Sequence, residues 1–229
     1  MGRWWILASV VVLVGCASAA ESEPVTPSTL ATTSTTATVA VAESTTTSRP
    51  LTAVERCLRR AVFSDPDLAD YVLPYPPGTG YSVIQSYCND DGSHENQLAY
   101  DFGMPIGSDV VAARGGTVIE LKEDVADRAP TSQLNYLLIR HGDGTIGFYA
   151  HLTADGALVE VGDGVAQGQV IALSGETGRT GGPVLHFGVY PSYPPVEGFD
   201  LPVTFANADG QLDPRGGLFE GGFYWATNE

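Results

Sequence analysis

Basic residues are scarce in this chain: 11 Lys and Arg stand against 27 Asp and Glu, a formal net charge of −16 at pH 7. A surface this acidic repels phosphate backbones and anionic headgroups, which makes nucleic acid a poor candidate partner. Cysteine is also rare, with three in 229 residues, too few for a zinc site built from thiolates. The apolar run from Trp4 to Val14 is too short to span a bilayer in a mature protein.

The N-terminal residues carry an export signal. Arg3 followed by the apolar run is typical of a secretory signal peptide, here residues 1–15. Leu13-Val14-Gly15-Cys16 resembles the bacterial lipobox, whose cysteine is acylated and becomes the mature N-terminus. We therefore expect an exported protein, anchored through lipid on Cys16 to the outer face of a bacterial membrane. Ordinary cleavage after Ala17-Ser18-Ala19 is the alternative and would give a secreted protein.

Residues 16–50 are dominated by Thr, Ser, Ala, Pro and Val and contain no aromatic residue. Such a composition cannot bury a core and predicts a disordered tether. A flexible chain of this length would lift a folded domain off a membrane surface into a wall layer. With Cys16 assigned to lipid, the remaining pair, Cys57 and Cys88, is most simply a disulfide formed in an oxidising compartment.

Residues 51–80 predict a short helical lead-in. Thr52 and Glu55 have the spacing of a capping box. One helical stripe then collects apolar side chains, at Val54, Cys57, Leu58, Ala61 and Val62. A second short helix is expected to start at Asp65-Pro66. Its buried side would be formed by Leu68, Tyr71 and Val72.

Residues 81–229 predict a mainly β domain with a core at 91–190. Short strands separated by glycine turns are expected at 81–86, 97–102, 109–113, 116–122, 135–141, 145–151, 169–174 and 184–190. The turn sequence HGDGT at 141–145 predicts a hairpin between its flanking strands. The charged segment 123–133 should be an exposed loop, and the tail from residue 191 should be loop with one or two edge strands. The fold class is therefore antiparallel β-sheet with one or two short N-terminal helices.

Two polar side chains lie on otherwise apolar strands. In the strand at 184–190, His186 points away from the face that carries Leu185 and Phe187. In the strand at 97–102, Asp101 likewise lies opposite the apolar face. Each needs a partner. Asp101, His186 and one further imidazole would make a three-ligand site with an open fourth position, the arrangement that a catalytic zinc requires.

Several blocks of the sequence resemble the lysostaphin and LytM type of metallopeptidase, the M23 family. They are LAYDFGMPIGSDVVAARGGTV, IRHGDGTIGFYAHL, VGDGVAQGQVIALSGETGRTGGPVLHFGV and, more weakly, LPVTFANADG, and the resemblance runs over about residues 73–226. It implies a β-sheet groove in which a histidine, an aspartate and a second histidine hold a zinc ion. It also implies peptidoglycan as the partner and cleavage of its peptide bonds.

The resemblance assigns roles to individual residues. Asp101 and His186 match metal ligands, and His151 matches the histidine that stabilises the transition state or moves a proton. His141 matches a histidine that looks structural, at the hairpin turn. The peptide would be gripped between the loops after Gly78 and Arg128.

Two positions depart from the family pattern. Gln97 stands four residues before the aspartate, where the first ligand is usual, so His94 would have to return through a loop to complete the site. Val184 replaces the first histidine of His-x-His, and valine can neither accept nor donate a proton. Three readings follow. The first is an active zinc endopeptidase that works without the second histidine, with activity reduced by its loss. The second is an inactive tethered module that binds peptidoglycan or regulates hydrolases. The third is a structural domain without metal, in which hydrogen bonds satisfy Asp101 and the histidines.

Overall fold

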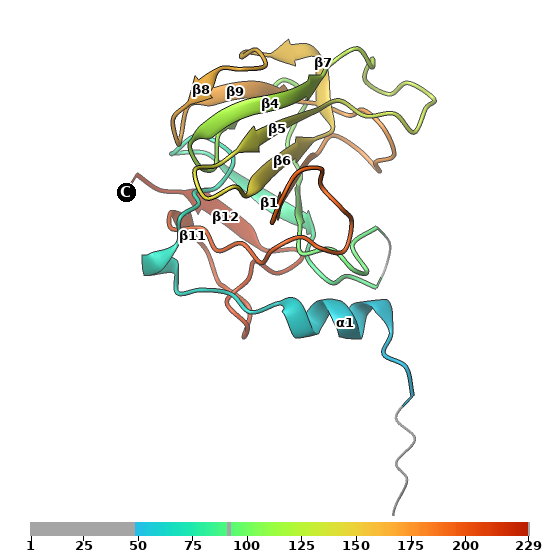
Figure 1. The fold of residues 1–229 in the computed structure, drawn as a ribbon, viewed down its shortest axis with the longest axis vertical. Helices are drawn as coiled ribbons and strands as arrows, with labels where there is room; N and C mark the ends of the chain where they lie inside the picture. The colour runs from blue at the N-terminus through green and yellow to red at the C-terminus, as the bar shows by residue number, and fades with distance from the viewer. Residues whose placement is uncertain (1–48, 91–92, 229) are drawn as a thin grey trace, which may run out of the picture. The chain divides into compact units, whose positions relative to one another are not determined.

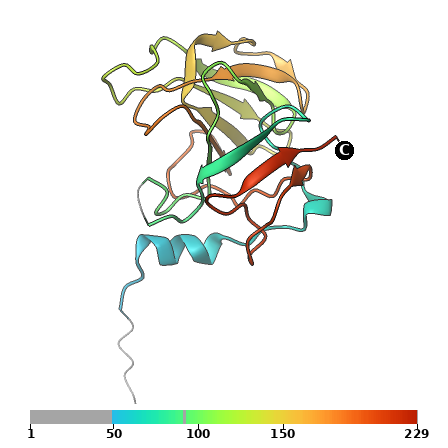
Figure 2. The same ribbon diagram turned by 180° about the vertical axis from the view of Figure 1, so that it is seen from behind.

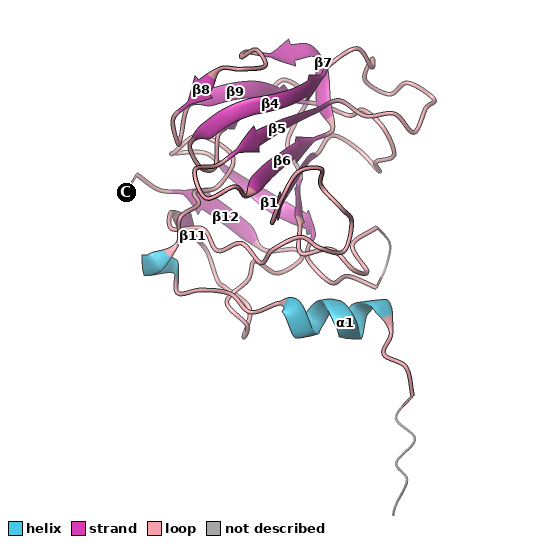
Figure 3. Cartoon of the chain, viewed as in Figure 1, coloured by secondary structure: helices cyan, strands magenta, loops and turns pink. Residues whose placement is uncertain are grey.

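The computed structural model describes residues 49–90 and 93–228. The predicted signal peptide, the lipidation site Cys16 and nearly all of the predicted tether lie outside these residues. The described chain is mostly β, with one α-helix, α1 (Ala53–Arg60), and a single 3-10 turn, η1 (Pro66–Leu68) (Figures 1 and 3). No helix within the described residues is both long and apolar enough to cross a membrane.

The strands form two antiparallel sheets. The nine-stranded sheet has the order β11-β12-β1-β2-β10-β6-β5-β4-β8, and the three-stranded sheet has the order β3-β9-β7. The strand bounds are β1 (Gly80–Gln85), β2 (Tyr100–Phe102), β3 (Asp109–Val111), β4 (Gly116–Lys122), β5 (Tyr136–Arg140), β6 (Ile146–Ala150), β7 (Leu152–Ala157), β8 (Gly164–Val165), β9 (Val170–Ser174), β10 (Leu185–Tyr190), β11 (Ala208–Asp209) and β12 (Phe223–Ala226). The predicted fold class is confirmed.

Strand alternation places the core on one side of the large sheet. Leu185 and Phe187 of β10 pack with Tyr100 and Phe102 of β2, and all four are fully buried. The intervening residues point to the other side of the sheet, as the period of two requires. This alternation separates the hydrophobic core from the polar residues of the candidate site.

The hairpin predicted from the turn at 141–145 is confirmed. β5 and β6 pair antiparallel, with Arg140 opposite Ile146, and the backbone N–H of His141 donates to Thr145 O over 2.9 Å. The edge strands predicted in the tail are also present, because β12 pairs with both β11 and β1. In Figure 2 β12, in red, lies beside β1, in green.

The helix α1 forms where its sequence predicts, but it ends at Arg60, so Val62, expected on its apolar stripe, lies outside it and is 74% exposed. The Thr52 side chain accepts from Glu55 N–H, while the Glu55 carboxylate accepts from Thr52 N–H, which completes the capping box. The helix buries Cys57, with Ala61 just beyond its end, and Cys57 is disulfide-bonded to Cys88. The helix is therefore attached covalently to the segment that follows β1.

Two local features differ from the sequence-based expectation. The second helix is only the turn η1, and Leu68, expected to be buried, is 78% exposed. The chain extends immediately afterwards because Tyr71 pairs with Phe205 and Val72 N–H donates to Ala113 O, so pairing replaces a further helical turn. In addition, β7 was not foreseen: the chain bends at His151, between β6 and β7, and passes to the second sheet.

Gly175 starts the glycine-rich loop and approaches the chain at β7 closely. A Cβ at this position would lie 2.4 Å from Thr153 N and 2.6 Å from Leu152 C, both backbone atoms. Gly175→Ala should therefore lower the free energy of unfolding by about 1–3 kcal/mol through overpacking. Gly181→Ala, where nothing lies within 4 Å, is the matched control and should change it by no more than about 0.5 kcal/mol. Urea denaturation measures both, and equal effects would contradict the packing described here.

Candidate functional site

Strand register brings Asp101 and His186 together. β2 and β10 pair antiparallel with His186 directly opposite Asp101. Both side chains lie on the face away from the core, and His186 Nδ1 is 2.8 Å from Asp101 Oδ1. His186 is only 7% exposed, so the aspartate supplies the partner that its burial requires.

His94 joins this pair from a turn at residues 93–96, between β1 and β2. Its side chain is 1% exposed. The ring Nδ1–H donates to Ser86 O over 3.1 Å, which leaves Nε2 facing the pair. His94 Nε2 lies 3.2 Å from His186 Nδ1 and 3.5 Å from Asp101 Oδ1.

These three residues fit a metal ion. Their potential ligand atoms all lie within 4.8 Å of one another. Because a carbonyl only accepts, the bond to Ser86 places the proton of a neutral His94 on Nδ1 and leaves a lone pair on Nε2. That lone pair faces a carboxylate oxygen and a second ring nitrogen, an arrangement that a shared cation stabilises. Two imidazoles and one carboxylate are ligands that zinc accepts.

The Asp101 carboxylate is held in its charged form. Burial by itself would raise the pKa of Asp101, but the hydrogen bond and charge interaction with His186, together with those of His94, outweigh burial and hold this pKa well below its usual range. Asp101 is therefore ionised at neutral pH and can attract a cation.

His151 lies beside the cluster in an unusual backbone conformation. Its φ is +63°, in the left-handed region that few residues other than glycine occupy. The ring Nδ1–H donates to Thr177 O over 2.6 Å, and the ring centroid is 6.1 Å from that of His186. Burial, the largest cause, lowers the pKa of His151. The ring is therefore neutral at pH 7, with Nε2 unprotonated.

The polar groups that orient these rings were not predicted from the sequence. Thr177 is fully buried, and its hydroxyl accepts from Asn135 N–H and donates to Leu152 O. Asn135 is also fully buried and bonds both polar backbone groups of Val125. A threonine among glycines, in GETGRTGG, was the one sequence feature that pointed to such a group. A backbone carbonyl such as Ser86 O leaves no sequence signal, because every residue carries one.

Gln97 and Val184, where the sequence was expected to depart from the family pattern, both line the groove. Val184 is 1% exposed and its backbone bridges to Gly175. The Gln97 amide donates to Ser93 O over 3.1 Å. His94 belongs to the group of possible metal ligands.

The groove above the cluster has a volume of about 1020 Å³, room for an extended peptide and not only an ion. Its lining residues include Asp101, His151, His186 and Phe148. Further lining residues lie at 84–89, 93–97, 179–184 and 195–197, together with Leu134, Ala150, Tyr190 and Glu220. Of the two loops expected to grip a peptide, the one after Gly78 contributes no lining residue, whereas Leu134, from the segment after Arg128, lines the groove.

The family comparison agrees with this geometry. Residues 95–197 match the model of Peptidase family M23. The chain carries an M23 peptidase domain. The matched residues include Asp101, His151, Val184 and His186, and His94 immediately precedes them.

Known M23-related proteins show how far the likeness extends. The chain is 37% identical over 138 residues to the peptidoglycan DD-endopeptidase ShyB of Vibrio cholerae, covering 57% of this chain and 30% of the relative. It is 36% identical over 108 residues to ShyA of the same organism, covering 47% of this chain and 23% of the relative. The chain thus spans less than a third of the length of these relatives.

Solved structures give a partial match. A zinc-containing peptidase from Vibrio cholerae is 33% identical with a TM-score of 0.39, and the match covers 59% of this chain and 42% of that one. The lysostaphin catalytic domain from Staphylococcus simulans is 30% identical with a TM-score of 0.35, and the match covers 51% of this chain and 80% of that one. The family assignment rests on the sequence match.

His141 lies outside this site, as expected of a structural histidine. Its ring Nδ1–H donates to Gly115 O over 3.0 Å, and among the described residues its Nε2 has no hydrogen-bond partner. Burial lowers the pKa of His141 below the ordinary 6.5. The unfolded chain therefore binds this proton first, and the stability that the neutral ring contributes is lost as the pH falls below about 6.5.

The variant His141→Gln tests this linkage. Between pH 7.5 and 5, the free energy of unfolding of the unmodified protein should fall more steeply than that of the variant, by up to about 1.4 kcal/mol per pH unit for a single proton. Denaturation at a series of pH values measures both slopes. Parallel profiles would show that His141 is protonated equally in the folded and unfolded states.

Proposed function

We propose that this domain is a zinc endopeptidase that cuts peptide bonds in bacterial peptidoglycan. His94, Asp101 and His186 hold the metal, and His151 is the catalytic residue. The observation that carries the proposal is the convergence of three possible ligand atoms within 4.8 Å of one another in a groove of about 1020 Å³. The names of the relatives, peptidoglycan endopeptidases, support the choice of substrate.

Each residue has a task that follows from its contacts. Zinc, when bound, polarises the scissile carbonyl and lowers the pKa of water. Asp101 contributes negative charge, and the Ser86 carbonyl fixes the tautomer and orientation of His94, as hydrogen-bond partners of metal ligands commonly do. The groove orients the peptide over these residues.

His151 performs the proton chemistry. Its Nδ1–H is held by Thr177 O, so Nε2 is the nitrogen available to the substrate. Because burial lowers its pKa, the ring starts neutral and accepts a proton at Nε2. Once protonated, the same nitrogen donates to the oxyanion or returns the proton to the leaving amine.

A second function is favoured by one observation, the valine at position 184. The family resemblance gives this position to a second proton-handling histidine, and loss of such a group commonly costs a factor of about 100 to 10,000 in rate. The competing proposal is a tethered module that keeps the metal and the groove but binds peptidoglycan or regulates hydrolases without cutting.

Both functions place the domain outside the cell membrane. We propose that lipid on Cys16 anchors the chain to the outer face of the membrane, and that residues 16–50 let the domain reach the wall. The disulfide between Cys57 and Cys88 is consistent with an oxidising compartment.

Metal analysis tests the site itself. The full-length chain should bind about one zinc per molecule and release it to a chelator, since the three ligands need no other chain. His186→Ala should weaken zinc binding about 100-fold or more, because loss of even an outer-shell partner costs 10- to 100-fold. His141→Gln, which alters a histidine outside the groove, is the control and should bind normally. An unmodified chain without zinc would contradict the proposal.

The variant Val184→His separates the two functions. It should raise the release of peptides from purified peptidoglycan by about 100-fold, because it adds an imidazole to the groove that His151 also lines. The unmodified chain should still show slow, chelator-sensitive release if it is an enzyme. No release by either protein, with zinc bound and peptidoglycan retained in a pull-down, would favour the binding module.

A further inference from the structure

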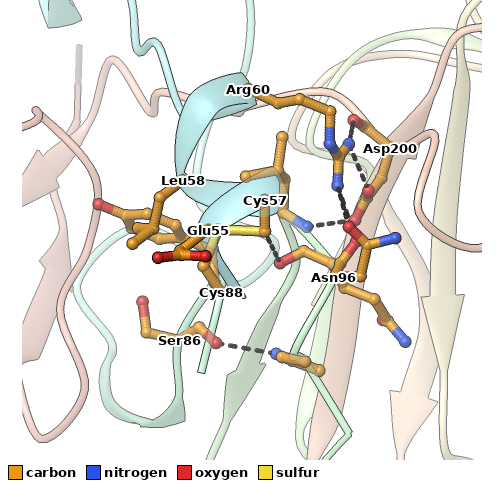
Figure 4. The surroundings of a disulfide bond; sticks show 12 residues. Glu55, Cys57, Leu58, Arg60, Ser86, Cys88, Asn96 and Asp200 are labelled. Atoms are coloured by element: carbon orange, nitrogen blue, oxygen red, sulfur yellow. Dashed lines mark hydrogen bonds and ion pairs between the residues drawn. A yellow bond between two sulfur atoms is a disulfide. The ribbon is translucent and has the colours of Figure 1, made fainter. Parts of the chain in front are cut away.

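We propose that α1 and the disulfide form a clamp that holds His94 in the metal site. The clamp consists of the Cys57–Cys88 disulfide and the Arg60–Asp200 ion pair. This inference rests on the proposed zinc site and makes Cys57, Cys88, Arg60 and Asp200 positioning residues. Figure 4 shows the clamp, with Ser86 and the ring bonded to it below the disulfide.

His94 needs positioning that the other two ligands do not. Asp101 and His186 lie on β2 and β10, where the ladder places them opposite each other. His94 lies in a turn and is in no strand. The residues of this turn lack the ladder hydrogen bonds that hold Asp101 and His186. Ordering the turn costs conformational entropy, so other contacts must hold this ligand in place.

The disulfide holds residues 86–88, which follow β1 and lie before the turn of His94. Cys57 comes from α1 and is fully buried, and Cys88 lies two residues after Ser86, whose carbonyl orients the His94 ring. The backbone N–H of Cys88 donates to Gln97 O over 2.9 Å. The cross-link thus joins α1 to Cys88, whose backbone is paired with Gln97 on the far side of the turn.

Arg60 holds residues 96–98, which follow the turn of His94. Its guanidinium donates to Asn96 O over 2.7 Å and to Asp200 O over 2.9 Å. It also pairs with the Asp200 carboxylate at 3.1 Å, and that carboxylate is fully buried and accepts from Leu98 N–H as well. Since Asn96 and Leu98 flank Gln97, and the Gln97 N–H donates to His94 O, these contacts fix the backbone next to the ligand.

The clamp also accounts for the position of the third ligand. Gln97 is the residue in register with the usual ligand position, and its carbonyl is occupied by Cys88 N–H. The turn held by the clamp directs His94 at Asp101 instead. A ligand supplied by a turn in this way depends on contacts with residues far away in the chain.

A double-mutant cycle on zinc affinity, measured by competition with a chelator, tests the clamp. The double variant Cys57→Ser/Cys88→Ser should bind zinc about 10- to 100-fold more weakly than the unmodified full-length chain. The same two substitutions in a His94→Ala background should weaken the remaining affinity by less than about 3-fold, because the ligand that the clamp serves is already gone. Equal losses in the two backgrounds would overturn the proposal.

Arg60→Met provides a second arm that leaves the disulfide in place. It should also weaken zinc binding about 10-fold or more, and Arg59→Met, on the exposed side of the same helix, should not. Thermal unfolding without metal confirms that each variant is folded. Zinc affinity unchanged in Arg60→Met and in the double serine variant would overturn the clamp alone, whereas an unmodified chain that binds no zinc would overturn the zinc site together with it.

Discussion

The pairing of β2 with β10 is the interaction on which the site depends. Its register sets Asp101 opposite His186, while their neighbours Tyr100, Phe102, Leu185 and Phe187 are buried on the other face. A shift of one residue would turn the carboxylate and the imidazole into the hydrophobic core, at a large cost in free energy. The same packing that stabilises the sheet therefore selects the register that assembles the polar pair.

The remaining functional groups reach this pair through less regular structure. His94 comes from a turn held by a disulfide and a buried ion pair, and His151 occupies a left-handed bend between two sheets. In both cases one ring nitrogen donates to a backbone carbonyl, of Ser86 or of Thr177. In each case the other ring nitrogen is left for the site, as a possible metal ligand in His94 and as a proton acceptor in His151.

Physical reasons separate what the sequence predicted from what it did not. The alternation around Asp101 and His186 is local, and it predicted both the strands and the face on which each residue lies. The placement of His94 depends on Arg60 and Asp200, which are 140 residues apart in the chain, and no local pattern contains such contacts. The helix expected after Pro66 failed for a related reason, since the pairing of Tyr71 with Phe205 outweighs a weak local preference.

The central claim is that His94, Asp101 and His186 together bind one metal ion. The most direct test is an anomalous difference map, collected at the zinc edge, from crystals of the zinc-loaded protein. The account predicts one strong peak about 2.0–2.2 Å from His94 Nε2, an Asp101 carboxylate oxygen and His186 Nδ1. A peak bound by Gln97 with His94 turned away, or no peak in the groove, would contradict it.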